Sequence, residues 1–169
     1  MKIRNLELKD APFMLEWMHD KSVTELLQAD FDSKNINDCF KFIEDSKDKN
    51  KNIHFAIVDE NDTYMGTISL KNITLTDAEL AIAIRTMAMG KGISSFAINE
   101  IIKYAFAVLK LKYVYWYVSP KNIRAIKFYN KNGFAKVEYE DIVNRGILLS
   151  DSIKIHEFEW YLVINNFTF

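Results

Sequence analysis

Two of the chain's five glycines, Gly90 and Gly92, lie between a segment of alternating apolar residues and a long segment with helical periodicity. The first turn of a helix leaves backbone N–H groups without partners, and the helix dipole adds partial positive charge there. Glycine lets a ligand approach the backbone closely, and Lys91 adds a cation. This order of strand, glycine turn and helix predicts an anion-binding loop, with a tight turn that binds nothing as the alternative.

The chain has 169 residues, of which 49% are hydrophobic and 27% charged, a balance typical of one globular domain over residues 1–169. Its formal net charge of -1 speaks against nucleic acid as a partner. Residues 1–10 lack the apolar run of a secretory signal, and no stretch approaches the ~18–20 apolar residues of a membrane span. We therefore expect a cytoplasmic protein that associates with no membrane.

A single cysteine, Cys39, stands among Phe40, Phe42 and Ile43 in a helix-like segment. We expect it to be a small core residue, because no base follows nearby in the sequence to activate it. The Cys and His pairs of a structural zinc site are also missing from the sequence, so no metal is expected.

The N-terminal part is expected to hold a strand within residues 1–8 and two helices. Asp10 is the expected N-cap of the first helix, and Pro12 fits its first turn. The second helix follows Ser33. Its buried face is expected to carry Ile36, Phe40 and Ile43.

Three segments of alternating apolar residues follow, and the short turns between them predict an antiparallel meander. A strand that is apolar on both faces comes later, as suits a central strand covered on both sides. The last strand shifts its apolar pattern from odd to even positions, which predicts a β-bulge. The expected strands are residues 53–59, 64–70, 80–84, 113–118, 135–139 and 153–163. Helices over about 91–109 and 121–132, the second ending at Asn132-Gly133, complete a mixed α/β domain.

The glycine segment fits neither of two common nucleotide loops. A Walker A loop requires Gly-x-x-x-x-Gly-Lys-Ser/Thr, and this spacing is missing. A dinucleotide-binding loop requires a third glycine where Ser95 stands, and an acidic residue ~20 residues further on. The next strand runs instead into Ser119-Pro120-Lys121-Asn122.

Two segments carry a resemblance. Residues 84–94 read Ile-Arg-Thr-Met-Ala-Met-Gly-Lys-Gly-Ile-Ser, and residues 122–134 contain Asn122, Ala125, Tyr129 and Gly133-Phe134. These resemble the acetyl-CoA loop, Gln/Arg-x-x-Gly-x-Gly/Ala, and the later Asn…Ala…Tyr…Gly-Phe segment of the GCN5-related N-acetyltransferases. The resemblance covers roughly residues 1–165 and implies a central, mostly antiparallel sheet flanked by helices. Met89 stands where the pattern has Gln or Arg, and Ser94 where it has Gly or Ala.

Acetyl-CoA is the cosubstrate that this resemblance implies. Backbone groups of Ile84 and Thr86 would meet the pantetheine arm, and Asn122 would bind the pantetheine or cap its helix. The pyrophosphate would be held by backbone N–H groups of Met89, Gly90, Lys91, Gly92, Ile93 and Ser94.

Acetyl transfer to an amine needs a base for the amine proton, a donor to the developing oxyanion and an acid for the leaving thiolate. The resemblance makes Tyr129 the candidate acid, with core packing as its alternative. Glu79 is the candidate base, with a solvated strand-end carboxylate as the alternative. A backbone N–H of residues 80–86 is the candidate oxyanion donor. His54 and His156 are further candidates for the base.

The acceptor is expected to be a small-molecule or peptide amine. The chain is similar to branches of the family that acetylate ribosomal-protein α-amines or nucleotide-linked amino sugars. Trp17, His19 and Asp20 resemble a Trp-x-x-Asp segment whose helices form part of the acceptor pocket, with helix packing or a solvated face as the alternatives. Lys21 and Tyr115 are further candidates for contacts to a nucleotide sugar.

Two other functions stay open. In one alternative the domain is a noncatalytic sensor of acyl-CoA. In the other it binds a different nucleotide at the Gly90 loop. Phe158, Trp160 and Phe167 suggest a homodimer, with burial inside one chain as the alternative.

Overall fold

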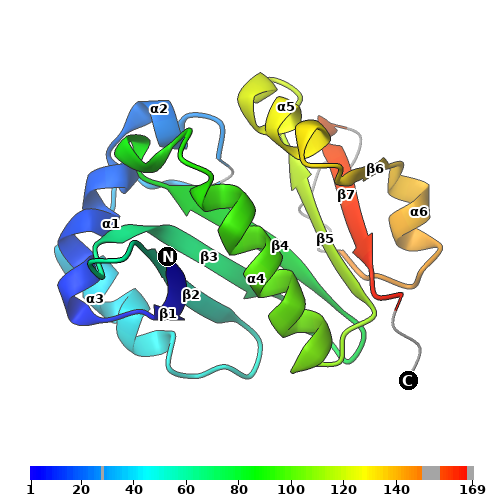
Figure 1. The fold of residues 1–169 in the computed structure, drawn as a ribbon, viewed down its shortest axis with the longest axis horizontal. Coiled ribbons are helices and arrows are strands. Elements are labelled where there is room, and N and C mark those ends of the chain that lie inside the picture. Colours follow the sequence, from blue (N-terminus) through cyan, green and yellow to red (C-terminus); the bar gives the residue numbers. More distant parts are fainter. Residues whose placement is uncertain (28, 150–156, 167–169) are drawn as a thin grey trace.

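A seven-stranded sheet in the order β1-β2-β3-β4-β5-β7-β6 forms the centre of the protein, with helices on both faces (Figure 1). The computed structural model describes residues 1–27, 29–149 and 157–166. The strands are β1 (Lys2–Asn5), β2 (Ile53–Val58), β3 (Tyr64–Lys71), β4 (Asp77–Ile84), β5 (Tyr113–Val118), β6 (Ala135–Val137) and β7 (Glu159–Ile164). The helices are α1 (Ala11–Met18), α2 (Lys21–Thr24), α3 (Ile36–Asp45), α4 (Ile93–Ala107), α5 (Ile123–Lys131) and α6 (Tyr139–Val143), with 3-10 turns η1 (Leu8–Asp10) and η2 (Thr86–Ala88). The predicted mixed α/β class is confirmed.

The predicted antiparallel meander is also confirmed, since β2 pairs with β3 and β3 with β4 in antiparallel register. β4 begins at Asp77, earlier than the expected residue 80. The Asp77 carboxylate accepts hydrogen bonds from the hydroxyls of Thr74 and Thr76, and these fix the turn before the strand. Asp77 also pairs with Tyr113 of β5, which extends β4 at its start.

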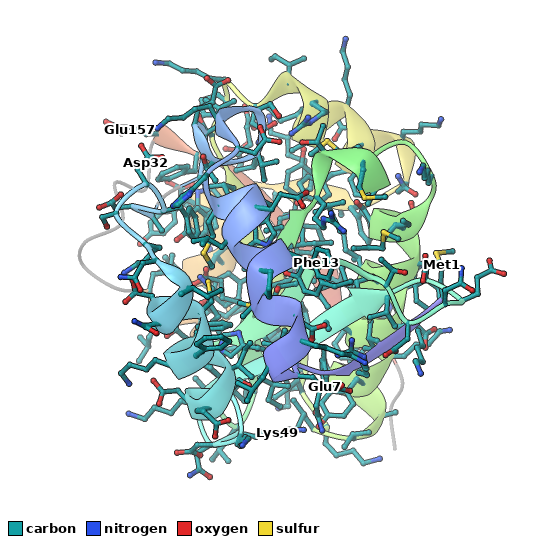
Figure 2. The ribbon with its side chains drawn as sticks, turned by 90° about the vertical axis from the view of Figure 1, so that its left-hand side faces the viewer. Met1, Glu7, Phe13, Asp32, Lys49 and Glu157 are labelled. Atoms are coloured by element: carbon teal, nitrogen blue, oxygen red, sulfur yellow. The ribbon has the colours of Figure 1, made fainter. Side chains whose placement is uncertain are left out.

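Side chains alternate between two cores on opposite faces of the sheet. On one face α4 and α5 pack against residues such as Ile68 and Leu80. On the other face α1 and α3 cover Ala56 and Val58, and Figure 2 looks onto this side, with α3 beside α1. A third cluster lies under α6, where Ile142 packs with side chains of β5 and β7. The central strand β5 is therefore covered on both faces, as its sequence predicts.

Asp10 corrects one expectation about the first helix. It occupies the N-cap position of α1, but its carboxylate makes no hydrogen bond that caps this helix. The preceding turn η1 places Asp10 at its third position, where the carboxylate accepts the Glu7 N–H at 2.9 Å. The same carboxylate forms a two-point ion pair with Arg4, at 2.8 and 2.9 Å.

Phe40 corrects a second expectation. It is 37% exposed, whereas Cys39 and Ile43 are buried, so the expected core role of Cys39 is confirmed and that of Phe40 is wrong. Cys39 and Ile43 lie four residues apart on one face of α3, and Phe40 is rotated away from that face.

Two short helices were not predicted from the sequence. In the N-terminal part α2 lies between α1 and α3, and in the C-terminal part α6 follows β6. The expected C-cap of α5 is confirmed, because Gly133 has a left-handed φ of 76°. Trp160 is buried within the chain against Tyr117 and Tyr139. Most of the segment in which a bulge is predicted lies outside the described residues, and so do His156 and Phe167. Phe158 is described and packs on Tyr117.

Candidate active site

The strands β4 and β5 run parallel but pair only at their first residues, ending with Glu79 opposite Tyr115. Beyond that pair no register is found between them, and Figure 1 shows the two strands diverging from their shared lower end. Among the described strands, β4 from Leu80 to Ile84 therefore has β3 on one side and no strand pairing on the other. The sheet opens at this vertex, and the candidate site residues gather around it.

Glu79 lies at the vertex and is only 5% exposed. One carboxylate oxygen lies 2.8 Å from the Lys71 ammonium, and the other accepts a hydrogen bond of 3.1 Å from the Asn72 side-chain amide. The alternative of a solvated strand-end carboxylate is therefore wrong. A buried carboxylate held at both oxygens has the fixed geometry that acid–base work needs.

Two tyrosines of β5 lie close enough to feel the charge of Glu79. Burial foremost, and the Glu79 carboxylate next, raise the pKa of Tyr115 above its usual value. The same two causes raise the pKa of Tyr117 to about 12. Both phenols therefore stay protonated at neutral pH and act as hydrogen-bond donors. Tyr115 is buried, so of these two only Tyr117 has a surface that an acceptor would reach.

Tyr129 lies on the opposite face, in α5, and is 7% exposed. Its ring packs 5.3 Å from the Trp116 ring and 4.9 Å from the Tyr161 ring. Burial raises its pKa, so the hydroxyl keeps its proton at neutral pH. Among the described residues this hydroxyl has no hydrogen-bond partner. Tyr129 therefore packs through its ring and leaves its hydroxyl free to donate.

An unpaired donor lies beside Tyr129. The indole nitrogen of Trp116, the β5 residue next to the last paired position, is buried and has no hydrogen-bond partner within the described part of the chain. Leaving a buried donor unpaired costs about 1–3 kcal/mol, so such groups usually meet a ligand or an ordered water. This orphaned donor fits a ligand that enters between β4 and β5.

The glycine loop follows β4 and η2 at the open end of the strands. Gly90 and Gly92 have φ of 75° and 76°, a conformation that favours glycine. Within the described residues no side chain caps the N-terminus of α4, so no side-chain acceptor pairs with its first N–H groups. The Ile93 side chain is part of the core, which leaves only its backbone for a ligand. The loop has the unpaired donors and open backbone that a pyrophosphate needs.

Thr86 and Asn122 take part in local contacts. The Thr86 hydroxyl donates to Asp20 at 2.5 Å, and this bond foremost, with Ser22 next, lowers the pKa of Asp20. The side-chain oxygen Oδ1 of Asn122 accepts the Ala125 N–H at 3.1 Å and so caps α5. The side-chain amide nitrogen of Asn122 remains unpaired in the described structure, so helix capping and pantetheine binding are compatible.

The start of the loop is tied to the rest of the fold by Arg85. Its guanidinium makes a two-point ion pair with Glu16 of α1, at 3.0 and 2.7 Å, and donates to the Tyr64 carbonyl at 2.9 Å. It also stacks over the Phe13 ring, 4.6 Å from the centroid. These contacts fix the end of β4, from which the loop departs.

The structure brings only some of the expected acceptor residues to the site. Trp17 is buried in the α1–α3 core and donates to the Tyr64 hydroxyl at 3.0 Å, so it takes the packing role. His19 is exposed and contacts the Lys34 carbonyl at 2.8 Å. Of the three, Asp20 alone contacts the loop region, through Thr86.

His54, the other candidate base, lies on β2 and contacts the Ser69 hydroxyl at 2.7 Å. Burial foremost, and then the charge of Lys71, lower its pKa to about 4. It lines a cavity of about 480 Å³ between α3 and β2 together with Phe42. The strand β3 separates His54 from β4, so Glu79 is the better placed base at the vertex.

The comparisons with known proteins agree with this geometry. A family model described as "Acetyltransferase (GNAT) domain" matches residues 1–135. The chain belongs to this family, which confirms the resemblance seen in the sequence. It is an acetyl-CoA-dependent N-acyltransferase.

Particular relatives are similar to the chain over most of its length. The N-acetyltransferase p20 of Bacillus licheniformis is 29% identical over 141 residues, covering 80% of this chain and 79% of the relative. Acetyltransferase PseH of Campylobacter jejuni is 26% identical over 140 residues, covering 79% of this chain and 84% of the relative. The crystal structure of spermidine N-acetyltransferase from Vibrio cholerae in complex with CoA and spermine has a TM-score of 0.78 at 20% identity, covering 96% of this chain and 94% of that chain. This last similarity shows a shared fold.

Sequence reasoning missed three residues of this region. Lys71 and Asn72 hold Glu79, and the pairing of Lys71 with Glu79 in the β3–β4 register is the signal that could have found the first. Arg124 reaches the glycine loop from α5, and nothing in its local sequence indicates that contact.

Within the described residues, no helix is long and apolar enough to cross a bilayer.

Proposed function

We propose that this enzyme transfers the acetyl group of acetyl-CoA to a primary amine by direct attack at the vertex between β4 and β5. When bound, acetyl-CoA supplies the activated acetyl thioester. The glycine loop and the N-terminus of α4 bind its pyrophosphate, and the unpaired edge of β4 up to Ile84 meets the pantetheine arm. A cytoplasmic location stays our prediction.

Glu79 and Tyr129 divide the proton transfers between the two faces of the sheet. Glu79 accepts the amine proton, directly or through a water molecule, because its carboxylate is fixed at the vertex by Lys71 and Asn72. Tyr129 donates its hydroxyl proton to the sulfur as the C–S bond breaks, because burial keeps the phenol protonated and its hydroxyl has no competing partner among the described residues.

An amino sugar, linked to a nucleotide, is the acceptor that we propose. The observation that carries this choice is the Lys71 ammonium 2.8 Å from Glu79. A polyamine carries a second ammonium group, and the positive charge of Lys71 at this site would repel it. The hydroxyls of a sugar would instead accept hydrogen bonds from Lys71 and Asn72, and Tyr117 offers an aromatic ring on the same face.

Thiol release tests the proposal with one panel of amines. Acetyl-CoA is mixed with a nucleotide-linked amino sugar, free glucosamine, peptides with a free N-terminus, or spermidine, and free CoA thiol is measured. We expect the nucleotide-linked amino sugar to give a kcat/KM at least tenfold above the others. A higher value with a peptide or with spermidine would overturn the acceptor. Tight acetyl-CoA binding without thiol release for any amine would favour the noncatalytic sensor.

A further inference from the structure

Arg124, in the first turn of α5, reaches across to the acetyl-CoA loop. Its Nη1 lies 3.0 Å from the Met89 sulfur, and its Nη2 donates to the Ser22 backbone carbonyl at 3.2 Å. The side chain therefore bridges α5, α2 and the loop at the open end of the two diverging strands.

Both of these acceptors are uncharged. A thioether sulfur accepts hydrogen bonds weakly, whereas a guanidinium binds carboxylates and phosphates with charge-assisted, often two-point hydrogen bonds. The nearby carboxylate is Asp20, and its hydrogen bonds come from Thr86 and Ser22. In the described structure Arg124 forms no direct ion pair; its charge acts on Asp20 only at longer range, as the last of the causes that lower the pKa of that carboxyl.

The residue at position 89 departs from the family pattern. The acetyl-CoA loop of the family has glutamine or arginine there, and this chain has Met89. The loop's own cation is Lys91, which is exposed. The guanidinium of Arg124 packs against the Met89 side chain, so an arginine from another element stands beside the position where the loop lacks one.

We propose that Arg124 is a phosphate ligand of the acetyl donor. On binding, its guanidinium exchanges the Met89 sulfur and the Ser22 carbonyl for phosphate oxygens of the coenzyme. A side chain able to donate hydrogen bonds to phosphate, which the loop lacks at Met89, is thereby supplied from α5. This inference rests on acetyl-CoA as the donor in the proposed function, but not on the acceptor.

Binding of CoA by calorimetry tests the role without any acceptor. Arg124→Met is compared with Lys127→Met, which removes an exposed cation from the same helix. Since each 1.4 kcal/mol corresponds to tenfold in affinity, and a hydrogen bond to a charged group contributes roughly that much, we expect Arg124→Met to weaken CoA binding about tenfold. Lys127→Met should change CoA affinity less than about twofold. Arg124→Lys should have an intermediate effect, because lysine keeps the positive charge but lacks the planar guanidinium that makes two-point hydrogen bonds.

A second measurement separates phosphate binding from a general disturbance of the site. S-Acetyl-N-acetylcysteamine carries the thioester without any phosphate, so Arg124→Met should leave the kcat/KM for this donor within twofold of wild type. 3′-Dephospho-CoA then shows which phosphate is bound. If the tenfold loss persists with it, the ligand is the pyrophosphate, and if the loss disappears, the ligand is the 3′-phosphate.

CoA binding to Arg124→Met as tight as to wild type would overturn the proposal. An equal loss of activity with the phosphate-free donor would overturn it as well, because the effect would then not depend on phosphate. Failure of the proposed function looks different: wild type would bind CoA with the expected dependence on Arg124 but release no thiol with any amine.

Discussion

The Lys71 ammonium lies 2.8 Å from a carboxylate oxygen of Glu79, at the last position where β4 still pairs with β5. Asn72 occupies the other oxygen, so the β3–β4 hairpin that forms the sheet also fixes the carboxylate. Since β4 leads at its far end to the glycine loop, where we propose that acetyl-CoA binds, one strand connects the proposed donor site to the proposed base.

Glu79→Gln should lower kcat strongly and leave acetyl-CoA affinity nearly unchanged. The amide keeps the size of the side chain but cannot accept the amine proton, and general base catalysis contributes typically about 10²–10⁴-fold. The measurement is steady-state thiol release together with calorimetric titration of acetyl-CoA. Glu60→Gln, at an exposed turn, is the matched control and should behave like wild type. A Glu79→Gln enzyme with normal kcat would remove Glu79 from the mechanism.

Tyr129→Phe should lower kcat about 10²-fold without lowering the melting temperature. The ring contacts with Trp116 and Tyr161 are retained, and the missing hydroxyl leaves no partner unpaired among the described residues. The loss should shrink with an acetyl thioester of an acidic aromatic thiol, which needs no proton as it leaves. An equal loss with both donors would argue against Tyr129 as the acid.

Arg85→Met should reduce the free energy of unfolding by about 2–3 kcal/mol, since it leaves the buried Tyr64 carbonyl without its donor and breaks the pair with Glu16. Because Arg85 fixes the end of β4, acetyl-CoA should also bind more weakly. Urea denaturation and calorimetry measure the two effects. Glu16→Gln, whose side chain is half exposed, should cost less. Unchanged stability of Arg85→Met would show that these contacts do not hold the loop.

His54 should make the protein less stable in mild acid. Its pKa is about 4 in the folded protein against 6.5 for a free histidine, so the unfolded chain takes up a proton first as the pH falls. The free energy of unfolding should therefore fall between about pH 7 and pH 4 and show no further loss from this group below pH 4. The loss should be about 1–2 kcal/mol, less than the pKa difference alone implies because the ring is partly exposed.

His54→Gln isolates that contribution, because glutamine does not titrate but can still bond to the Ser69 hydroxyl. Denaturation at pH 7 and pH 5 should show a smaller difference for the variant than for wild type. Equal differences in the two proteins would mean that His54 is not the group responsible.

Gly66→Ala should destabilise the protein by about 1–3 kcal/mol. A Cβ at this position would lie 2.3 Å from the Ala83 carbonyl oxygen and 3.0 Å from the Ile84 Cα, both backbone atoms of β4 that cannot move freely. The resulting shift at Ile84 should also weaken acetyl-CoA binding. Thermal denaturation and calorimetry check both effects, and a variant as stable as wild type would show that β4 yields at this point.

Much of the fold could be predicted from local sequence. Alternating apolar residues located β2 and β3, a run apolar on both faces located β5, and the glycine pair located the loop between β4 and α4. Less local features were missed. Phe40 has the right residue type for a core position, but the face of α3 that is buried depends on how α3 packs against α1, and the start of β4 depends on its pairing with β5.

The sequence by itself determined the glycine loop between a strand and a helix, the mixed sheet and the family's two motifs, because these follow from periodicity and from residues close together in the chain. Only the tertiary structure decided what surrounds the reacting groups. Lys71 reaches Glu79 across a hairpin, and Arg124 reaches Met89 from a helix 35 residues further on. Tyr129 keeps its hydroxyl free while its ring is buried. These relationships join distant parts of the chain, and packing of the sheet and helices sets them.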